Sequence, residues 1–148
     1  NKYFFNNAFF HHICYYSFYI IMTIKSSQTL VKEALEQIKT ISPDEALKKS
    51  NNIECNLIDI RDIRELQKDG RVDNASHVPR GMLEFWLDPD SVYFKEGKLD
   101  LSKEMVLFCA GGLRSALSAK SLQEMGFAKV SHIDGGFAAM RSKGFKIV

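Results

Sequence analysis

Cys109 is the residue of this chain best placed to do chemistry. It follows the apolar run MVLF (105–108), which predicts a buried strand, and it precedes Gly111 and Gly112. Open α/β sheets bind ligands at the carboxyl ends of their strands, and a pair of glycines lets the backbone turn tightly and present its N–H groups to a ligand. We therefore expect a thiol at the centre of a loop of backbone donors.

A helix is predicted directly after this loop, over residues 113–125, because apolar residues recur there at helical spacing. The first N–H groups of a helix have no partner within it and lie at the positive end of its dipole. They bind anions and favour a thiolate over a thiol. Arg114, the nearest cation in sequence, is expected to bind an anionic substrate. The predicted anion-binding loop comprises Ala110, Gly111, Gly112, Leu113, Arg114 and Ser115.

Alternating strands and helices are predicted to position this loop. Short apolar runs predict strands over residues 55–60, 105–108 and 129–134. Helical spacing and capping patterns predict helices over residues 27–40, 42–49, 62–68, 113–125 and 137–143. Residues 71–104 are expected to form a long irregular region. The alternation predicts an α/β fold in a single domain, with a parallel sheet flanked by helices on both faces.

Composition excludes several classes of protein. The chain has 148 residues, of which 45% are hydrophobic and 26% charged, as in one globular domain. A formal net charge of +2 provides no field for nucleic acid or a membrane surface. Three widely spaced cysteines, Cys14, Cys55 and Cys109, match neither a disulfide framework nor a metal site. We therefore expect a reducing, cytoplasmic location, with no metal and no cofactor, and interpret Cys55 as a packed thiol.

Residues 1–21 differ in composition from the remainder of the chain. Asn, Lys, Tyr, Phe and Ile, which have A/T-rich codons, supply 16 of these 21 residues. The favoured interpretation is upstream sequence translated in frame, with Met22 as the true start. A signal sequence or membrane anchor and a packed extension are the alternatives, although the apolar stretch of 15 residues is shorter than the ~20 that a span needs. An N-terminal helix is expected over 22–40 and the domain over 41–148.

The segment CAGGLRS (109–115) fits the pattern C-x-x-G-x-R-S and resembles the active-site loop of rhodanese-like sulfurtransferases. LIDIRDIREL (57–66) resembles the first conserved Asp-x-Arg block of that family. HVPRGMLEFW (77–86) resembles the segment that follows the family's G-H-I-P-G-A block, and DGGFAAM (134–140) resembles its C-terminal Gly-Gly signature. The four blocks occur in the family's order and span about residues 41–148, so the chain is similar to a single rhodanese-like domain.

The resemblance implies a persulfide mechanism. Cys109 would take sulfur from thiosulfate or a protein persulfide and pass it to a thiol or cyanide. Arg114 would help to bind an anionic donor, and Ser115 would cap the helix or bond the persulfide. Asp59 and Arg61 match the family's Asp-x-Arg pair, with Asp59 expected to brace Arg61 or nearby backbone as structural support.

Two other functions stay open. The chain could be a sulfur-carrier or persulfide-sensing module without turnover, which an exposed apolar patch beside the loop would favour; Phe85, Trp86 and Leu87 are the candidates. It could also be a dual-specificity-type phosphatase or arsenate reductase, which share the Cys, the loop and the Arg. Their pattern is C-x5-R, whereas Cys109 and Arg114 form C-x4-R. The shorter ring suits a sulfur atom better than a phosphoryl group.

Overall fold

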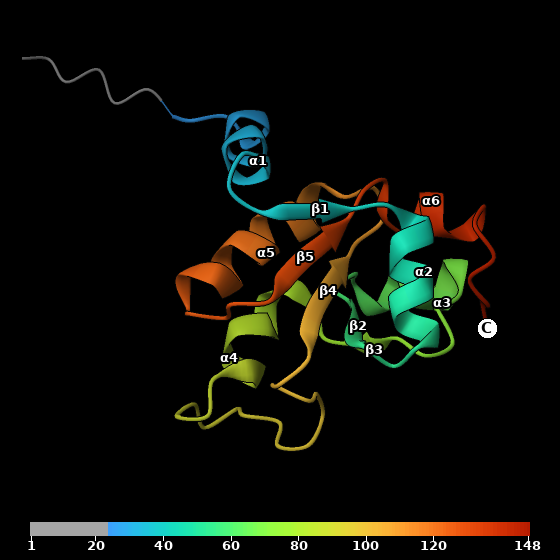
Figure 1. Cartoon of the computed structure of the whole chain (residues 1–148). Coiled ribbons are helices and arrows are strands. Elements are labelled where there is room, and N and C mark those ends of the chain that lie inside the picture. Colours follow the sequence, from blue (N-terminus) through green and yellow to red (C-terminus); the bar gives the residue numbers. More distant parts are fainter. Residues whose placement is uncertain (1–23) are drawn as a thin grey trace, which may run out of the picture.

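The computed structural model describes residues 24–148 (Figure 1). The alternatives for residues 1–21 therefore concern a segment outside the described residues. Within residues 24–148 the longest helix has 12 residues, too few to cross the apolar layer of a bilayer.

A five-stranded sheet forms the centre of the described part, and all of its strand pairs are parallel. The strand order across the sheet is β1-β5-β4-β2-β3, so β4 is the middle strand. The bounds are β1 Lys39–Ile41, β2 Cys55–Asp59, β3 Ser76–His77, β4 Glu104–Phe108 and β5 Val130–Ile133. Parallel neighbours need crossover connections, and helices supply most of them.

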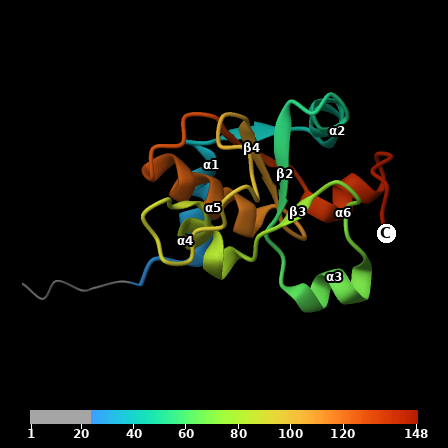
Figure 2. The same cartoon turned by 90° about the horizontal axis from the view of Figure 1, so that it is seen from below.

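Helices cover both faces of this sheet (Figures 1 and 2). One face carries α1 Ser27–Leu35, α4 Leu83–Leu87 and α5 Leu113–Glu124. α2 Pro43–Asn51 and α6 Gly136–Arg141 lie on the other face, and α3 Ile63–Asp69 lies on the same side as these two. The predicted α/β fold, with a parallel sheet between two helical layers, is confirmed.

The side chains of β4 show how one strand builds both halves of the core. Met105 and Leu107 pack into the cluster beneath α1, α4 and α5, whereas Val106 and Phe108 pack into the cluster on the α2 and α6 side. This alternation follows from the two-residue period of a strand. Cys109 continues it and belongs to the first cluster.

Local signals in the sequence explain where two helices begin. The Ser42 hydroxyl accepts a hydrogen bond from the Glu45 amide at 3.1 Å, and Pro43 occupies the first turn of α2. Asp62 and Glu65 form a capping box at the start of α3. The predicted starts of both helices are confirmed.

The helix expected over residues 27–40 is shorter than predicted, because α1 ends at Leu35. The amides of Gln37 and Ile38 both donate to the Ala34 carbonyl, which closes the helix. Ile38 is buried in the core cluster below α1. Its helical spacing from Leu35 and Ala34 therefore comes from packing against the core and not from a continued helix. The residues that follow it instead form β1, which exists through its pairing with β5.

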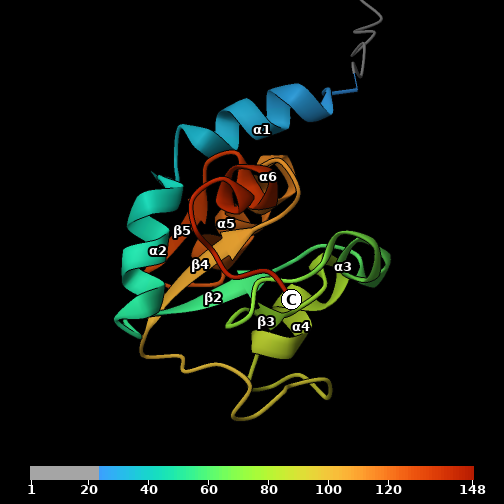
Figure 3. The same cartoon turned by 90° about the vertical axis from the view of Figure 1, so that its right-hand side faces the viewer.

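The region expected to be irregular, residues 71–104, also contains regular structure. It includes β3, a 3₁₀ turn at Arg80–Met82 and α4. β3 has two residues and is defined by its pairing with β2, so no local sequence pattern predicts it. The irregular part is the loop between α4 and β4, which lies at the bottom of Figure 3.

The chain leaves the neighbouring strands β2 and β4 toward opposite edges of the sheet. β2 leads to β3 at one edge of the sheet, whereas β4 leads to β5 on the opposite side. Ligands of open parallel sheets bind outside the carboxyl ends of the strands at such a point. Asp59 ends β2 and is paired in register with Phe108, the residue before Cys109. Cys109 therefore lies at this point of the sheet.

Candidate active site

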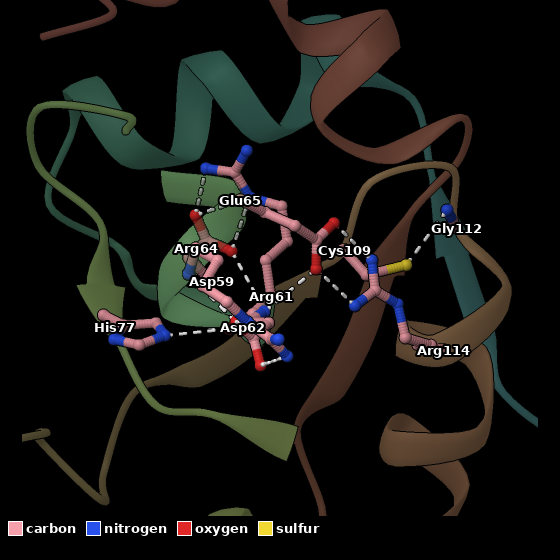
Figure 4. Close-up of polar contacts among 9 residues, drawn as sticks. All are labelled: Asp59, Arg61, Asp62, Arg64, Glu65, His77, Cys109, Gly112 and Arg114. Carbon is pink, nitrogen blue, oxygen red and sulfur yellow. Dashed lines mark hydrogen bonds and ion pairs between the residues drawn. The ribbon is translucent and has the colours of Figure 1, made fainter. Parts of the chain in front are cut away.

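Cys109 follows β4 directly and is 1% exposed. The backbone N–H of Gly112 donates to its sulfur, with 3.2 Å between nitrogen and Sγ (Figure 4). The loop therefore directs a backbone donor at the sulfur.

The start of α6 holds the first half of the loop. The N–H of Phe137 donates to the Cys109 carbonyl at 2.7 Å, and the N–H of Ala138 donates to the Ala110 carbonyl at 3.1 Å. Gly136 makes this approach possible: its φ is +53°, and an added Cβ would lie 2.3 Å from the Cys109 carbonyl oxygen. Because the carbonyls of Cys109 and Ala110 both accept hydrogen bonds from α6, the backbone of these two residues is held in one orientation.

The second half of the loop is the N-terminus of α5. Gly112 precedes this helix with φ of +97°, a conformation that favours glycine. The N–H groups of residues 113–115 have no acceptor within the helix. They offer donors and a positive dipole end beside the sulfur, an arrangement that suits an anion on Cys109.

The Ser115 side chain is buried and does not cap the helix, so of the two expected roles only a contact to the persulfide stays a prediction. Its hydroxyl donates to the Gly112 carbonyl oxygen at 3.0 Å, rather than accepting from a helix amide. Its second contact is the ring nitrogen Nδ1 of His132, at 3.3 Å.

Arg114 is paired with Glu65 of α3. The two guanidinium nitrogens lie 2.6 and 2.7 Å from the two carboxylate oxygens, in a bidentate arrangement. The hydrogen bond to Arg114 lowers the pKa of Glu65, and Glu65 in turn raises the pKa of Arg114 above its usual range. Cys109, which lies beside the guanidinium, also raises the pKa of Arg114. The guanidinium therefore stands beside the sulfur with its charge already partly balanced.

Asp59 and Arg61 form a second, fully buried pair. Nε and one terminal nitrogen of Arg61 bind the Asp59 carboxylate at 2.7–3.0 Å, and the Arg61 amide donates to the same carboxylate. The guanidinium also donates to the Gly70 carbonyl and lies 3.7 Å from the centroid of the Phe137 ring. This is the bracing expected from the sequence. It ties the end of β2 to α6, the helix that holds the loop.

Comparison with known proteins agrees with this geometry. The family model for the rhodanese-like domain matches residues 42–143. The chain belongs to the rhodanese family. Thiosulfate sulfurtransferase GlpE of Pseudomonas savastanoi pv. phaseolicola is 30% identical over 110 residues, which are 73% of this chain and 92% of that protein.

Two solved structures with folds similar to this chain carry different functional descriptions. A protein of unknown function from Rhodopseudomonas palustris, described as a "possible tyrosine phosphatase", is 43% identical, with a TM-score of 0.78 over 85% of this chain and 97% of that one. The polysulfide-sulfur transferase homodimer of Wolinella succinogenes is 33% identical, with a TM-score of 0.65 over 82% and 85%.

Sequence reasoning missed two residues of this rhodanese site. Glu65 carries a local signal, since Asp62 and Glu65 have the spacing of a capping box, but its pairing with Arg114 spans 49 residues. Arg80 donates to the backbone carbonyl of Arg114 at 2.8 Å. Local sequence patterns predict neither of these long-range contacts.

Cys55 lies at the opposite end of β2 from the loop. It is paired in register with Glu104, four positions before Phe108, which corresponds to about 13 Å along a strand. Burial raises the pKa of the Cys55 thiol to about 11. The interpretation of Cys55 as a packed thiol agrees with both observations.

The apolar patch considered beside the loop divides into separate parts. Leu87 is buried in the core, and Trp86 is partly buried against it. Phe85 is 51% exposed and packs edge-on against Tyr93, in the loop between α4 and β4. These residues therefore do not form one continuous exposed surface.

Proposed function

We propose that this chain is a sulfurtransferase that carries a sulfane sulfur atom on Cys109. The observation that supports the proposal most directly is the Gly112 N–H, 3.2 Å from Sγ, at the start of a helix whose first N–H groups have no acceptor within it. A ring of amides stabilises an anion without any general base, because thiolate and persulfide are both already charged.

The proposed cycle has two displacements at sulfur. The Cys109 thiolate attacks the outer sulfur of thiosulfate, a new S–S bond forms, and sulfite leaves with the electron pair of the old bond. A nucleophilic acceptor, cyanide or a thiolate, then attacks the outer sulfur of the Cys109 persulfide and regenerates the thiolate. Charge and electrons balance in both steps. A protein persulfide can replace thiosulfate as donor, and the chemistry suits a reducing compartment such as the cytoplasm.

Intact mass of the reduced protein after brief incubation with thiosulfate tests this proposal. The wild-type chain should gain one sulfur atom, and the Cys109→Ser variant should gain none. Cys55→Ser is the matched control and should gain sulfur like the wild type. A gain that persists in Cys109→Ser would overturn the assignment of the sulfur to Cys109.

Turnover separates an enzyme from a sulfur carrier. Cyanide or a small thiol, added to the persulfide form, should remove the added sulfur and release thiocyanate or a small persulfide. A persulfide that resists both acceptors, yet passes its sulfur to a second protein, would favour the carrier function.

A phosphatase is the second candidate, because the Rhodopseudomonas palustris relative carries that description. The loop of this chain has four residues between Cys109 and Arg114, one fewer than the C-x5-R pattern of such phosphatases. Hydrolysis of para-nitrophenyl phosphate that disappears in Cys109→Ser, in a protein that takes no sulfur, would favour the phosphatase over the sulfurtransferase.

A further inference from the structure

A chain of four hydrogen bonds connects the edge of the sheet to the sulfur of Cys109. His132 lies in β5 and is 2% exposed. Its Nε2 lies 3.0 Å from the hydroxyl of Thr40 in β1, and its Nδ1 lies 3.3 Å from the hydroxyl of Ser115. The Ser115 hydroxyl reaches the carbonyl of Gly112, whose own N–H reaches the sulfur.

The direction of each hydrogen bond in this chain follows from the number of hydrogens available. Ser115 has one hydroxyl hydrogen and donates it to the Gly112 carbonyl, so it accepts from His132. Nδ1 therefore carries the hydrogen, and the bare Nε2 accepts from Thr40. Burial lowers the pKa of His132, against an opposing effect of Asp134, which agrees with this neutral tautomer.

The contact to Gly112 orients the donors of the loop. A peptide unit is planar and trans, so the carbonyl of Gly112 and the N–H of Leu113 point in opposite directions. Ser115 and the amide of Ala116 both donate to that carbonyl, at 3.0 and 3.1 Å. Fixing the carbonyl therefore also fixes the Leu113 N–H, which points the opposite way, out of the first turn of α5.

We propose that His132 is a positioning residue of the sulfur-binding loop, which holds Ser115 in the rotamer that locks the Gly112–Leu113 peptide. This role rests on the proposed function of Cys109. His132 does not touch the sulfur and acts through Ser115 alone. The important atom is Nδ1, since Nε2 serves only to hold the ring toward Thr40.

Two variants separate the two ring nitrogens. The short amide of His132→Asn reaches the position of Nδ1 and keeps a donor for Ser115, whereas the longer amide of His132→Gln reaches the position of Nε2 and keeps the contact to Thr40. We expect His132→Asn to form persulfide from thiosulfate within about twofold of the wild-type rate. We expect His132→Gln to be about five- to tenfold slower, as the loss of one buried hydrogen bond predicts.

A second measurement keeps this test independent of sulfur transfer. Alkylation of Cys109 by iodoacetamide, followed by peptide mass, should show the same order of rates, with Asn near wild type and Gln slower. In a Ser115→Ala background the difference between Asn and Gln should disappear, because their shared partner is gone. Thermal unfolding of each variant shows whether it is folded, and only folded variants are compared.

The outcomes distinguish this inference from the proposed function. Equal rates for the two folded variants, in both assays, would overturn the role of His132 even if wild type forms a persulfide. A difference in alkylation, with no persulfide in any variant, would support the role of His132 and overturn the sulfurtransferase. A slower Asn than Gln would assign the role to Nε2 and contradict the proposal.

Discussion

Two carboxylate–arginine pairs lie next to the loop, and each takes its carboxylate from the segment 59–65. Asp59 and Arg61 are buried, with side chains 2% and 1% exposed, and they are neighbours in sequence. Glu65 and Arg114 are 29% and 38% exposed and come from distant parts of the chain. Their bidentate geometries are similar, whereas their surroundings differ.

The difference separates a structural role from a chemical one. Removing one partner of a buried pair leaves an uncompensated charge in a medium that solvates it poorly. Removing a partner of the exposed pair leaves a charge that water and salt can screen. We therefore expect the first pair to determine whether the domain folds, and the second to determine which donors the loop accepts.

Asp59→Ala should have the largest effect. Arg61 would keep its charge beneath the Phe137 ring without its carboxylate. The free energy of unfolding should fall by about 3–5 kcal/mol, measured by urea denaturation. Asp69→Ala, which removes an exposed carboxylate at the end of α3, is the control. A loss below about 1 kcal/mol for Asp59→Ala would place the two pairs in the same class.

Arg114→Ala should change the chemistry more than the stability. Persulfide formation from thiosulfate should slow by about tenfold or more, equivalent to one charge-assisted hydrogen bond, while transfer from a neutral organic trisulfide should change less. Rates with both donors, measured by intact mass, provide the comparison. Arg64→Ala on the exposed part of α3 is the matched control. Equal losses with both donors would mean that Arg114 only shapes the loop.

Glu65→Gln removes a charge and keeps the local structure. Gln can still accept from the Asp62 amide, so the capping box at α3 remains. With its charge unbalanced, Arg114 should attract thiosulfate more strongly and lower its KM by about two- to fivefold. Glu65→Ala, which also loses the capping box, serves as a comparison for stability. An unchanged KM in Glu65→Gln would mean that the carboxylate does not influence donor binding.

The smallest expected effect is the pH dependence of the Glu65 contribution. The hydrogen bond to Arg114 lowers the pKa of Glu65 in the folded chain below its ordinary value of 4.5. The pair therefore stabilises the fold above that value, and this contribution disappears as the pH falls through the lower, folded-state pKa. Urea denaturation of wild type and Glu65→Gln should differ by about 0.5 kcal/mol at pH 7 and converge in acid. A gap that widens in acid would contradict this sign.

Local patterns predicted the parts of the fold that depend on neighbouring residues. The apolar run before Cys109 became β4, and Ser42 and Pro43 began α2 as expected. β1 and β3 escaped prediction because they have three and two residues and are defined by pairing with β5 and β2. A strand that depends on a distant partner carries little signal of its own.

The candidate site divides in the same way. Cys109 and its glycines lie within one contiguous segment, so the sequence could bring them together without knowledge of the fold. The contact of Arg114 with Glu65 spans 49 residues, and that of Ser115 with His132 crosses from a helix to a strand. These contacts depend on how α3, α5 and β5 pack, which local periodicity does not encode.

The hydrogen bonds from α6 to the loop also determine when the loop can form during synthesis of the chain. Gly136 follows Cys109 by 27 residues, so during synthesis the thiol is made before the helix that fixes its carbonyls. At roughly 5–20 residues per second, this interval lasts about 1–5 s. A nascent chain thus contains Cys109 before it contains the helix that fixes the first half of the loop, and the loop is complete only after this helix has been translated.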